Sequence, residues 1–274
     1  MDRILLLDLY FLIYRAQVAF KSTTKDIDTR YVAVFNFFRS LRVLVEQFQP
    51  HKIFALLEGN PQFRKDIYAD YKANRIIKLA AKTPEQAERF QFSKREILNS
   101  LKHLPITSVR HPDYEADDLA LTLAADLQGE DITIITNDND YLQIPQRGYK
   151  VKIYNPIKKE YLTPPKYPIL AAKALYGDKS DNLKGLMGEK AAIKLLNDPT
   201  AFAQWMQQEE NRSLFNINKS LIELRLVPAD ELSFEEGITN FPLLRQEFER
   251  MSFASLIEQD AWMQFAKTFD CVKY

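Results

Sequence analysis

The stretch from Glu115 to Asp140 constrains this chain more than any other part of its sequence. It contains eight acidic residues and no lysine or arginine. Leu119 to Leu127 is apolar over most of a helical surface and predicts a helix. Asp131 to Thr136 is short and rich in β-branched residues, which is typical of a buried parallel strand. The stretch therefore predicts a helix followed by an inner strand of an α/β sheet.

Acidic side chains stand at both of these element ends. Three precede the helix and two follow the strand: Glu115, Asp117, Asp118, Asp138 and Asp140. Each group alone has an ordinary structural explanation, because acids cap helix N-termini and Asn-Asp-Asn-Asp is good turn chemistry. Brought together, five carboxylates repel one another unless they bind a cation or take up protons. Since oxygen ligands suit Mg²⁺ and Mn²⁺, the pattern predicts a site for hard divalent cations.

Two earlier strands add acids to the same predicted site. Residues 4–8 and 51–58 read as buried strands that end in Asp8 and Glu58. The carboxyl ends of parallel strands meet at one edge of an α/β sheet, and ligands bind there. Taken singly, Asp8 also fits a helix N-cap and Glu58 a solvated turn residue. Their joint placement with the later acids favours one shared site.

The rest of the chain predicts more of this α/β core, followed by helices. We expect helices at residues 10–20, 29–48 and 96–104, and strands at residues 106–109 and 149–154, the last of them at a sheet edge. A cluster of prolines predicts that a helical tail begins at about residue 165. Within this tail, Gly185-Leu-Met-Gly188 joins two helices, and such a turn can present backbone N–H groups to a phosphate.

Basic residues are concentrated just before the acidic stretch. The chain has 37 basic and 37 acidic residues, so its net charge indicates nothing about partners. Between Arg64 and Arg95, however, there are nine bases and four acids. Aromatic residues are interspersed from Phe63 to Arg75, and aromatic faces can stack on nucleobases while cations meet phosphates. A solvated face, or an amphipathic helix that packs its tyrosines, is the structural alternative. Beside a metal site, the basic strip favours a polyanionic substrate.

Length, cysteine content and hydropathy bound the class of protein. A chain of 274 residues suggests one large domain, or a domain with a smaller one appended. Its one cysteine, Cys271, excludes an internal disulfide and suits a reducing compartment. Asp8 and Arg15 interrupt the apolar N-terminal run, and no apolar stretch reaches ~20 residues, so we expect neither a signal peptide nor a membrane span. We expect a cytoplasmic monomer.

Five motifs occur in order between roughly residues 3 and 196. They are Asp8 with Tyr14-Arg15, Phe63-Arg64 with Tyr71-Lys72-Ala-Asn-Arg75, Tyr114-Glu-Ala-Asp-Asp118, Thr136-Asn-Asp-Asn-Asp140 with Gln143, and Gly177-Asp-Lys-Ser-Asp-Asn182. Together they resemble the flap endonuclease and 5′→3′ exonuclease family. The chain is most similar to the phage replication branch, which includes RNase H-type enzymes that remove RNA primers. A phage-encoded member would act in the host cytoplasm.

The resemblance implies a fold and a division of the chain. It implies a PIN-like α/β nuclease core with a parallel sheet over residues 1–165, with a helical arch at about residues 64–104. It also implies a helical C-terminal region over residues 166–274 that binds duplex through a degenerate helix-hairpin-helix. The implied substrate is branched or 5′-ended DNA or an RNA–DNA duplex.

The resemblance also assigns roles to individual residues. It implies two divalent metal ions, Mg²⁺ or Mn²⁺. The first set of ligands would be Asp8, Glu58, Glu115, Asp117 and Asp138, and the second Asp118, Asp140, Asp178 and Asp181. Lys72 and Arg75 would be catalytic cations at the base of the arch. The residues that contact nucleic acid would be Arg15, Arg64, Tyr71, Lys78, Lys82, Arg89, Lys179, Lys184, Gly185, Gly188 and Lys190, with Tyr71 stacking near the scissile nucleotide.

Three departures from the family pattern carry expectations of their own. The family usually has Asp at the position of Glu58, and a Gly shortly after the first Asp, where this chain has Leu9 and Tyr10. Its hairpin has three glycines in a longer loop, whereas GLMGEKAA is two residues shorter. The family hairpin holds K⁺, and we predict that the shorter loop binds duplex more weakly and does not distinguish K⁺ from Na⁺.

These residues favour a metal-dependent 5′ nuclease that hydrolyses phosphodiesters near a 5′ end or a flap junction, as in primer removal. Two alternatives stay open. A PIN-type ribonuclease acting on single-stranded RNA would share the carboxylates but would need neither arch nor hairpin. A non-catalytic nucleic-acid-binding replication factor would keep only remnants of the site, and the presence of acids at all nine ligand positions argues against it. The three histidines lie outside the acidic motifs, which excludes a Ser/His/Asp triad.

Overall fold

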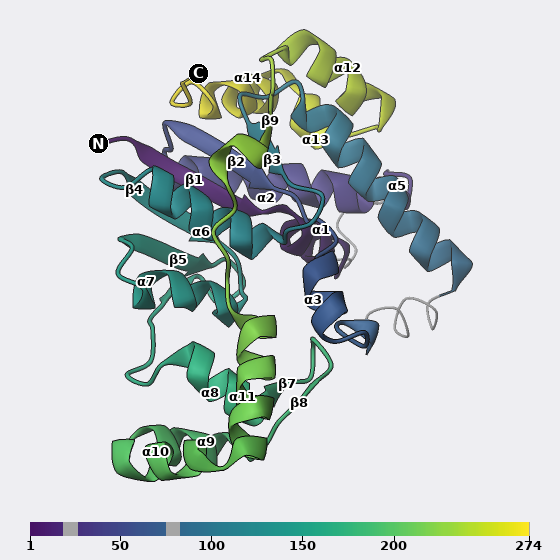
Figure 1. Cartoon of the computed structure of the whole chain (residues 1–274). Helices are drawn as coiled ribbons and strands as arrows, with labels where there is room; N and C mark the ends of the chain where they lie inside the picture. Colours follow the sequence, from purple (N-terminus) through teal and green to yellow (C-terminus); the bar gives the residue numbers. More distant parts are fainter. Residues whose placement is uncertain (19–26, 75–82, 274) are drawn as a thin grey trace.

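A seven-stranded sheet with helices on both faces forms the body of the protein, and a smaller helical lobe lies beyond one end of it (Figure 1). The computed structural model describes residues 1–18, 27–74 and 83–273. The strand order is β6-β5-β4-β1-β2-β3-β9. The strands are β1 (Arg3–Asp8), β2 (Lys52–Leu56), β3 (Thr107–Arg110), β4 (Asp131–Ile135), β5 (Val151–Asn155), β6 (Glu160–Leu162) and β9 (Ser233–Glu236).

The five inner strands, β1 to β5, are parallel, and β6 and β9 close the two edges antiparallel. The carboxyl ends of β1, β2 and β4 therefore meet at one edge, as predicted. The prediction that residues 149–154 form an edge strand is wrong, because β6 covers β5 on its outer side. β6 has only three residues, two of them exposed, and so carried little strand signal.

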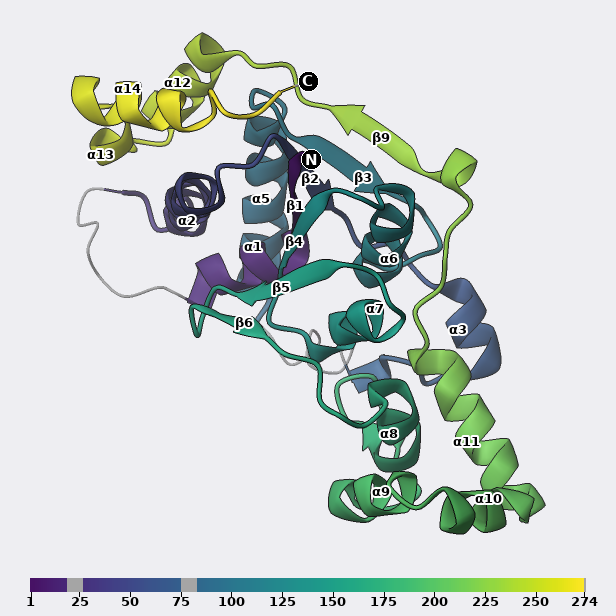
Figure 2. The ribbon, with the colours of Figure 1, turned by 90° about the vertical axis from the view of Figure 1, so that its left-hand side faces the viewer.

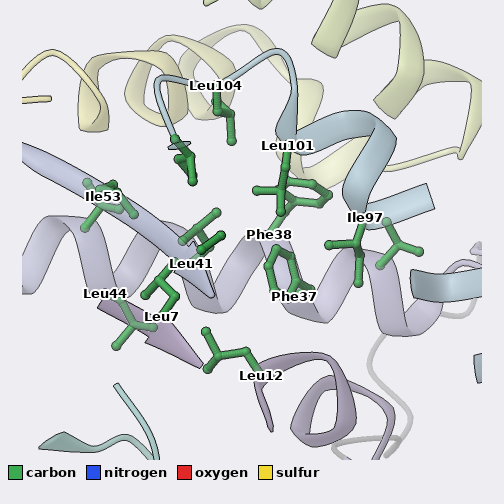
Figure 3. Packing of buried hydrophobic residues seen from close by; sticks show 14 of the residues in the cluster. Leu7, Leu12, Phe37, Phe38, Leu41, Leu44, Ile53, Ile97, Leu101 and Leu104 are labelled. Carbon is green, nitrogen blue, oxygen red and sulfur yellow. The ribbon is translucent and has the colours of Figure 1, made fainter. Parts of the chain in front are cut away.

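Helices cover both faces of the sheet (Figure 2), so every β1 side chain from Ile4 onward is buried, whichever face it points to. Leu5 and Leu7 pack with α1 (Leu9–Val18), α2 (Val32–Phe48) and α5 (Pro84–Leu101). Figure 3 shows this core, in which Phe37, Phe38 and Leu41 of α2 meet Leu101 of α5. Ile4 and Leu6 face the other way. They pack with α6 (Ala116–Asp126), η1 (Asn139–Leu142) and α7 (Gln143–Gln146).

The C-terminal part of the chain differs from the single helical region that was predicted after residue 165. The lobe comprises α8 (Ile169–Tyr176), β7 (Gly177–Asp178), β8 (Leu183–Lys184), α9 (Glu189–Leu196), α10 (Pro199–Gln207) and α11 (Glu209–Ile222). The chain then returns to the body through η2 (Ala229–Glu231) and pairs β9 with β3. The last helices are α12 (Phe241–Arg250), α13 (Ala254–Ile257) and α14 (Gln259–Thr268). Phe248 and Phe265 belong to the same core as Phe38, so the end of the chain completes the α/β body.

The segment predicted to form an arch, about residues 64–104, contains most of α3 (Gln62–Ile67) and all of α5. α5 begins at Pro84, earlier than the helix predicted from residue 96. Residues 75–82, which lie between the two helices, are outside the described ranges. The N-terminal end of α5 projects away from the sheet (Figure 1), while Ile97 and Leu101 near its other end are buried in the core. Within the described ranges, no helix is long and apolar enough to span a membrane.

Candidate active site

The predicted carboxylates converge at the carboxyl edge of the sheet. The register places Asp8 opposite Leu56 at the end of β2, and Thr136, which follows β4, donates its hydroxyl to Asp8 Oδ2 at 2.9 Å. Tyr141 of η1 is buried beneath the site. Burial raises the pKa of its hydroxyl, and nearby carboxylate charges raise it further: Asp8, Glu58, Asp117 and Asp138. Four acids from separate segments thus share one small region.

Glu58 reaches this region because the chain turns tightly after β2. Gly59 N–H donates to the Tyr114 carbonyl at 2.9 Å. A Cβ on Gly59 would lie 2.3 Å from the His111 carbonyl and 2.4 Å from that of Tyr114, so only glycine fits. The turn brings Glu58 Oε2 to 3.4 Å from the Ala116 N–H at the start of α6. The longer Glu at this position therefore still reaches the cluster.

Glu115 and Asp118 form a capping box at the start of α6, in which each side chain accepts from the other's backbone N–H. The helix-cap explanation for these acids is therefore correct. Asp118 is fully buried, and both its oxygens are occupied: Arg64 Nη1 and Nη2 donate at 2.8 and 2.9 Å, and the Arg225 N–H donates at 2.7 Å. Among the described residues, the acids that lie close enough to share one ion are Asp140, Asp178 and Asp181, so the structure does not bring Asp118 into the predicted second set.

Arg64 and Tyr71 are also buried, and for Arg64 this contradicts the predicted contact with nucleic acid. Arg64 is 1% exposed and additionally donates to Glu115, at 2.9 Å, and to the Leu221 carbonyl, at 3.0 Å. It therefore links α3, α6 and the end of α11. Tyr71 is 4% exposed, and its hydroxyl donates to Glu115 Oε2 at 2.8 Å, but it also borders the cavity over the carboxylates, so its stacking on a nucleotide stays a prediction. Charge and aromatic patterns could not distinguish these buried partners from a binding surface.

Lys72 lies between the two predicted metal sets. Its ammonium contacts Glu115 Oε1 and lies 3.8 Å from Asp181 Oδ1. Its backbone adopts the left-handed conformation (φ 56°), as does that of Asn182 (φ 61°). Lys72, for which this conformation is strained, and Asn182, which adopts it more readily, flank a contact in which the Lys72 N–H donates to the Asp181 carbonyl at 3.0 Å. Such strain is typical of functional sites.

A second group of carboxylates contains Asp140, Asp178 and Asp181. One oxygen of each lies within 4.8 Å of the others, a spacing that could hold a metal ion. A buried lysine that was not predicted, Lys173 of α8, contacts Asp140 and Asp178, each at 2.5 Å. A lone charge in the apolar helix ILAAKALY is the signal that could have identified it, because a buried lysine needs an acidic partner.

The pKa shifts of these acids reflect burial first and their mutual repulsion second. Burial, together with the charge of Asp138, raises the pKa of Asp8 to about 6 and that of Asp140 to about 7. Burial and two neighbouring acids raise the pKa of Asp117 well above its usual value. For Glu115, burial also acts upward, but Lys72 and Arg64 outweigh it and lower the pKa. A divalent cation would relieve this repulsion, so the all-oxygen donor set fits hard metal ions.

A cavity of about 900 Å³ opens over the first group of carboxylates. Its floor is acidic, and its side walls come from α1, α5 and the turn after β5: Tyr10, Phe11, Tyr14, Phe90 and Ile157. Tyr10 thus stands in the cavity wall, and Leu9 is buried in the core, where the family has a small residue. Asp138 also borders a second cavity of about 550 Å³ that reaches Lys173 and Tyr176 of α8. The acids therefore lie where two cavities meet.

The predicted hairpin residues lie on the lobe, between α8 and α9. Gly185 packs directly against Tyr176, whose carbonyl oxygen would be 2.1 Å from an added Cβ. The Leu186 and Met187 N–H groups both donate to the Leu175 carbonyl, so they are not available to a phosphate. Gly188 caps α9 in open space. The side chains of Lys179, Lys184 and Lys190 are exposed around this turn.

The remaining predicted contacts have mixed outcomes. Arg15 of α1 lines the cavity over the first group of carboxylates and donates to the Pro156 carbonyl at 3.3 Å. Arg89 lies on α5, in its projecting half, and is partly exposed. Arg75, Lys78 and Lys82 lie outside the described residues.

Comparison with known proteins identifies the family. The family described as "5'-3' exonuclease, N-terminal resolvase-like domain" matches residues 3–170. A 5'-3' exonuclease of Bacillus subtilis is 33% identical over 219 residues, covering 72% of this chain and 70% of the relative. The chain belongs to the 5′-3′ exonuclease family.

DNA polymerase I proteins are further relatives of this exonuclease-family chain. That of Streptococcus pneumoniae is 35% identical over 206 residues, which cover 68% of this chain but 22% of the polymerase. That of Thermus aquaticus is 29% identical over 301 residues, which cover 98% of this chain and 34% of the polymerase. The chain thus spans about a third or less of these polymerases.

Solved structures confirm the fold. Flap endonuclease-1 from Methanococcus jannaschii has a TM-score of 0.65 at 13% identity and covers 98% of this chain and 92% of its own. The bacteriophage T5 D15 flap endonuclease, described as a complex with DNA and metal ions, has a TM-score of 0.59 at 16% identity, covering 97% of both chains. The predicted PIN-like α/β core and the helical segments after it are therefore confirmed.

Proposed function

We propose that this protein is a metal-dependent 5′ nuclease that hydrolyses phosphodiesters near the 5′ end or flap junction of branched DNA or RNA–DNA. The observation that carries the proposal is the meeting of two carboxylate groups at the carboxyl edge of the sheet, with Lys72 between them. Relatives named as 5'-3' exonuclease and flap endonuclease support the same reaction.

Two divalent ions, Mg²⁺ or Mn²⁺, fit the two groups of carboxylates. Asp8, Glu58, Glu115, Asp117 and Asp138 would hold the first. Asp140, Asp178 and Asp181 would hold the second, whose carboxylates already attract the ammonium of Lys173. When bound, such ions supply an activated water and neutralise the oxygen that leaves phosphorus.

The protein's own side chains bind and orient the substrate. Lys72 would turn from Glu115 to the phosphate under attack, where a cation stabilises developing negative charge. Thr136 and the Phe11 N–H fix the Asp8 carboxylate with bonds of 2.9 and 3.1 Å, so this carboxylate needs no rearrangement. Arg75, outside the described residues, is proposed as a second catalytic cation.

Duplex DNA would bind along the lobe. Because the Leu186 and Met187 N–H groups are already hydrogen-bonded, we propose that exposed lysines bind the phosphates: Lys179, Lys184 and Lys190. The first N–H groups of α9 add a weak anion site. The acidic Glu189 in the first turn of α9 opposes this interaction, which favours a modest grip on the duplex.

Cleavage of a labelled 5′-flap DNA in Mg²⁺ tests the proposal. Wild-type protein should cut near the junction, and Asp138→Asn should lower the rate by about 10³ while binding in Ca²⁺ is retained. Asp126→Asn, the same change on α6 away from the site, is the matched control. Cleavage of single-stranded RNA but not of the flap would favour the PIN-type ribonuclease. Binding without cleavage of any substrate would favour the non-catalytic factor.

A further inference from the structure

A basic cavity lies next to the cavity over the first group of carboxylates, which the proposed function makes the catalytic cavity. Its volume is about 500 Å³, and residues of α1, α2 and the turn from β5 to β6 line it. Four cationic side chains border it: Arg15, Arg39, Arg42 and Lys159. Among the described residues, no aspartate or glutamate lines it. A cleft with charge of one sign concentrates ligands of the opposite sign.

Most of this positive charge is available to a ligand. Arg42 Nε lies 3.3 Å from Glu46 on the next turn of α2, so this one charge is partly offset. Arg39 is exposed and lies over the Phe35 ring, 5.8 Å from its centroid. Within the described ranges, neither Arg39 nor Lys159 forms an ion pair. An anion in the cavity would therefore meet several cations that are not already neutralised.

The turn that carries Lys159 holds it in an uncommon conformation. Asn155 Oδ1 accepts the Ile157 and Lys158 N–H groups at 2.9 and 3.1 Å, and the Lys159 N–H donates to the Asn155 carbonyl at 2.8 Å. Lys159 has a φ of 58°, a left-handed conformation that glycine or asparagine adopts more readily. A lysine at such a position suits a function of its side chain rather than of the turn.

The basic cavity connects with the catalytic cavity through an aromatic wall. Arg15 lines both cavities. Between Asp8 and Arg15 the wall carries Tyr10 and Tyr14, whose ring centroids lie 6.4 and 5.8 Å from that of Phe90. Aromatic side chains followed by cations match the requirements of unpaired nucleotides, whose bases stack while their phosphates meet positive charge. Paired bases have no exposed faces to stack, so the wall favours a single strand.

We propose that the basic cavity binds backbone phosphates of the single-stranded 5′ segment of the substrate. The strand would pass from the carboxylates, over the aromatic wall, to Arg39 and Lys159. This inference rests on the proposed function, because it requires a polynucleotide at the catalytic cavity. It adds a second place at which an overhanging strand is held.

Binding of the full-length protein to DNA in Ca²⁺ tests this site. The probes are a blunt duplex and the same duplex with a 5′ overhang of about eight nucleotides, a length typical of single-strand sites. Wild-type protein should prefer the overhang, and Arg39→Ala/Lys159→Ala should weaken overhang binding about tenfold. The salt slope should fall by about 0.7 for each phosphate that the variant no longer binds. Lys158→Ala is the matched control, since Lys158 lies on the same turn but is 64% exposed and 3.6 Å from Glu160.

The results separate this inference from the proposed function. Loss of the overhang preference in the double variant, but not in Lys158→Ala, supports the site. An unchanged overhang preference, or an equal loss of blunt-duplex binding, overturns it even if wild-type protein cleaves the flap in Mg²⁺. If wild-type protein neither cleaves nor binds either DNA, the proposed function fails, and this inference fails with it. A thermal melt of the double variant that matches wild type shows that the protein is folded.

Discussion

The two groups of carboxylates reduce the same electrostatic repulsion in different ways. The first group comes from the strand ends and the start of α6, and faces an open cavity, with Lys72 at its border. The second joins η1 to the lobe and surrounds Lys173, whose ammonium touches two of its three acids. A cation can enter the first group from solvent, whereas the second already contains one. We therefore expect a metal ion at the second group to compete with the ammonium of Lys173, whereas one at the first group would not.

Lys72→Ala is expected to have the largest effect on this comparison. If Lys72 acts on the transition state, kcat should fall by about 10²–10³ while KM changes little. Steady-state kinetics on a 5′-flap substrate measures both constants. Lys65→Ala removes a charge from nearby α3 and should have a much smaller effect. An equal fall in kcat for the two variants would mean that Lys72 acts only through the overall positive charge near the site and not on the transition state.

Stability should depend on pH through one acid from each group. The pKa values of Asp8 and Asp140, about 6 and about 7, lie above their values in the unfolded chain. Between about pH 4 and pH 7 the folded state therefore holds more protons, and the free energy of unfolding falls as pH rises. In EDTA we expect the free energy of unfolding to fall by roughly 2–4 kcal/mol between about pH 5 and pH 8.

Chemical denaturation with EDTA and with Mg²⁺ measures this loss. Mg²⁺ should reduce it, because it binds the ionised carboxylates of the folded state. Asp140→Asn, which removes one of the two groups, should make the EDTA profile shallower. Identical profiles with and without Mg²⁺ would contradict metal binding at these acids.

Lys173→Met should make the second group of carboxylates as accessible to a metal ion as the first. Removing the ammonium leaves Asp140 and Asp178 without their internal cation, so the second group should bind a divalent ion about tenfold more tightly. Without metal the variant should be less stable, because a buried charge has no partner left. Calorimetric titration with Mn²⁺ resolves the weaker site. Unchanged affinity would show that Lys173 does not compete with metal.

The smallest effect is expected at the turn between α8 and α9. Lys184→Ala should lower the salt slope of duplex binding by about 0.9, the value for one phosphate. Exchange of K⁺ for Na⁺ at equal ionic strength should leave wild-type binding unchanged, because lysine side chains replace an ion site. Titration of a 5′-overhang duplex in Ca²⁺ measures both. A strong preference for K⁺ would show that the short turn still builds that site.

The sequence was sufficient to predict the strands whose ends carry the acids. β1, β2 and β4 are short apolar runs that end in polar residues, and parallel strand ends share an edge whatever the details of packing. It was not sufficient for β9, whose residues SFEE are all exposed and lack any apolar alternation. β9 depends on pairing with β3 from far away in the chain. No local pattern contains that information.

Buried charges were the other limit of sequence reasoning. Arg64 lies among other basic residues and was grouped with them, although its partner is Asp118 in the acidic stretch. A count of charged residues along the sequence cannot show whether a given side chain points to solvent or to a buried partner. Replacing Arg64 by Ala would leave Asp118 buried without its partner, which typically costs about 3–5 kcal/mol. The same pattern thus indicated a binding strip and concealed a structural ion pair.

The return of the chain to β9 has a mechanical consequence for the lobe. A terminal appendage hangs from one connection and can swing about it in any direction. This lobe is inserted between β6 and β9, so it is attached to the body at both ends. Arg64 adds a further attachment at the Leu221 carbonyl, and the Lys72 N–H adds another at the Asp181 carbonyl. We therefore expect this lobe to move less than a terminal appendage would, and the spacing of Asp178 and Asp181 from Asp140 to vary little.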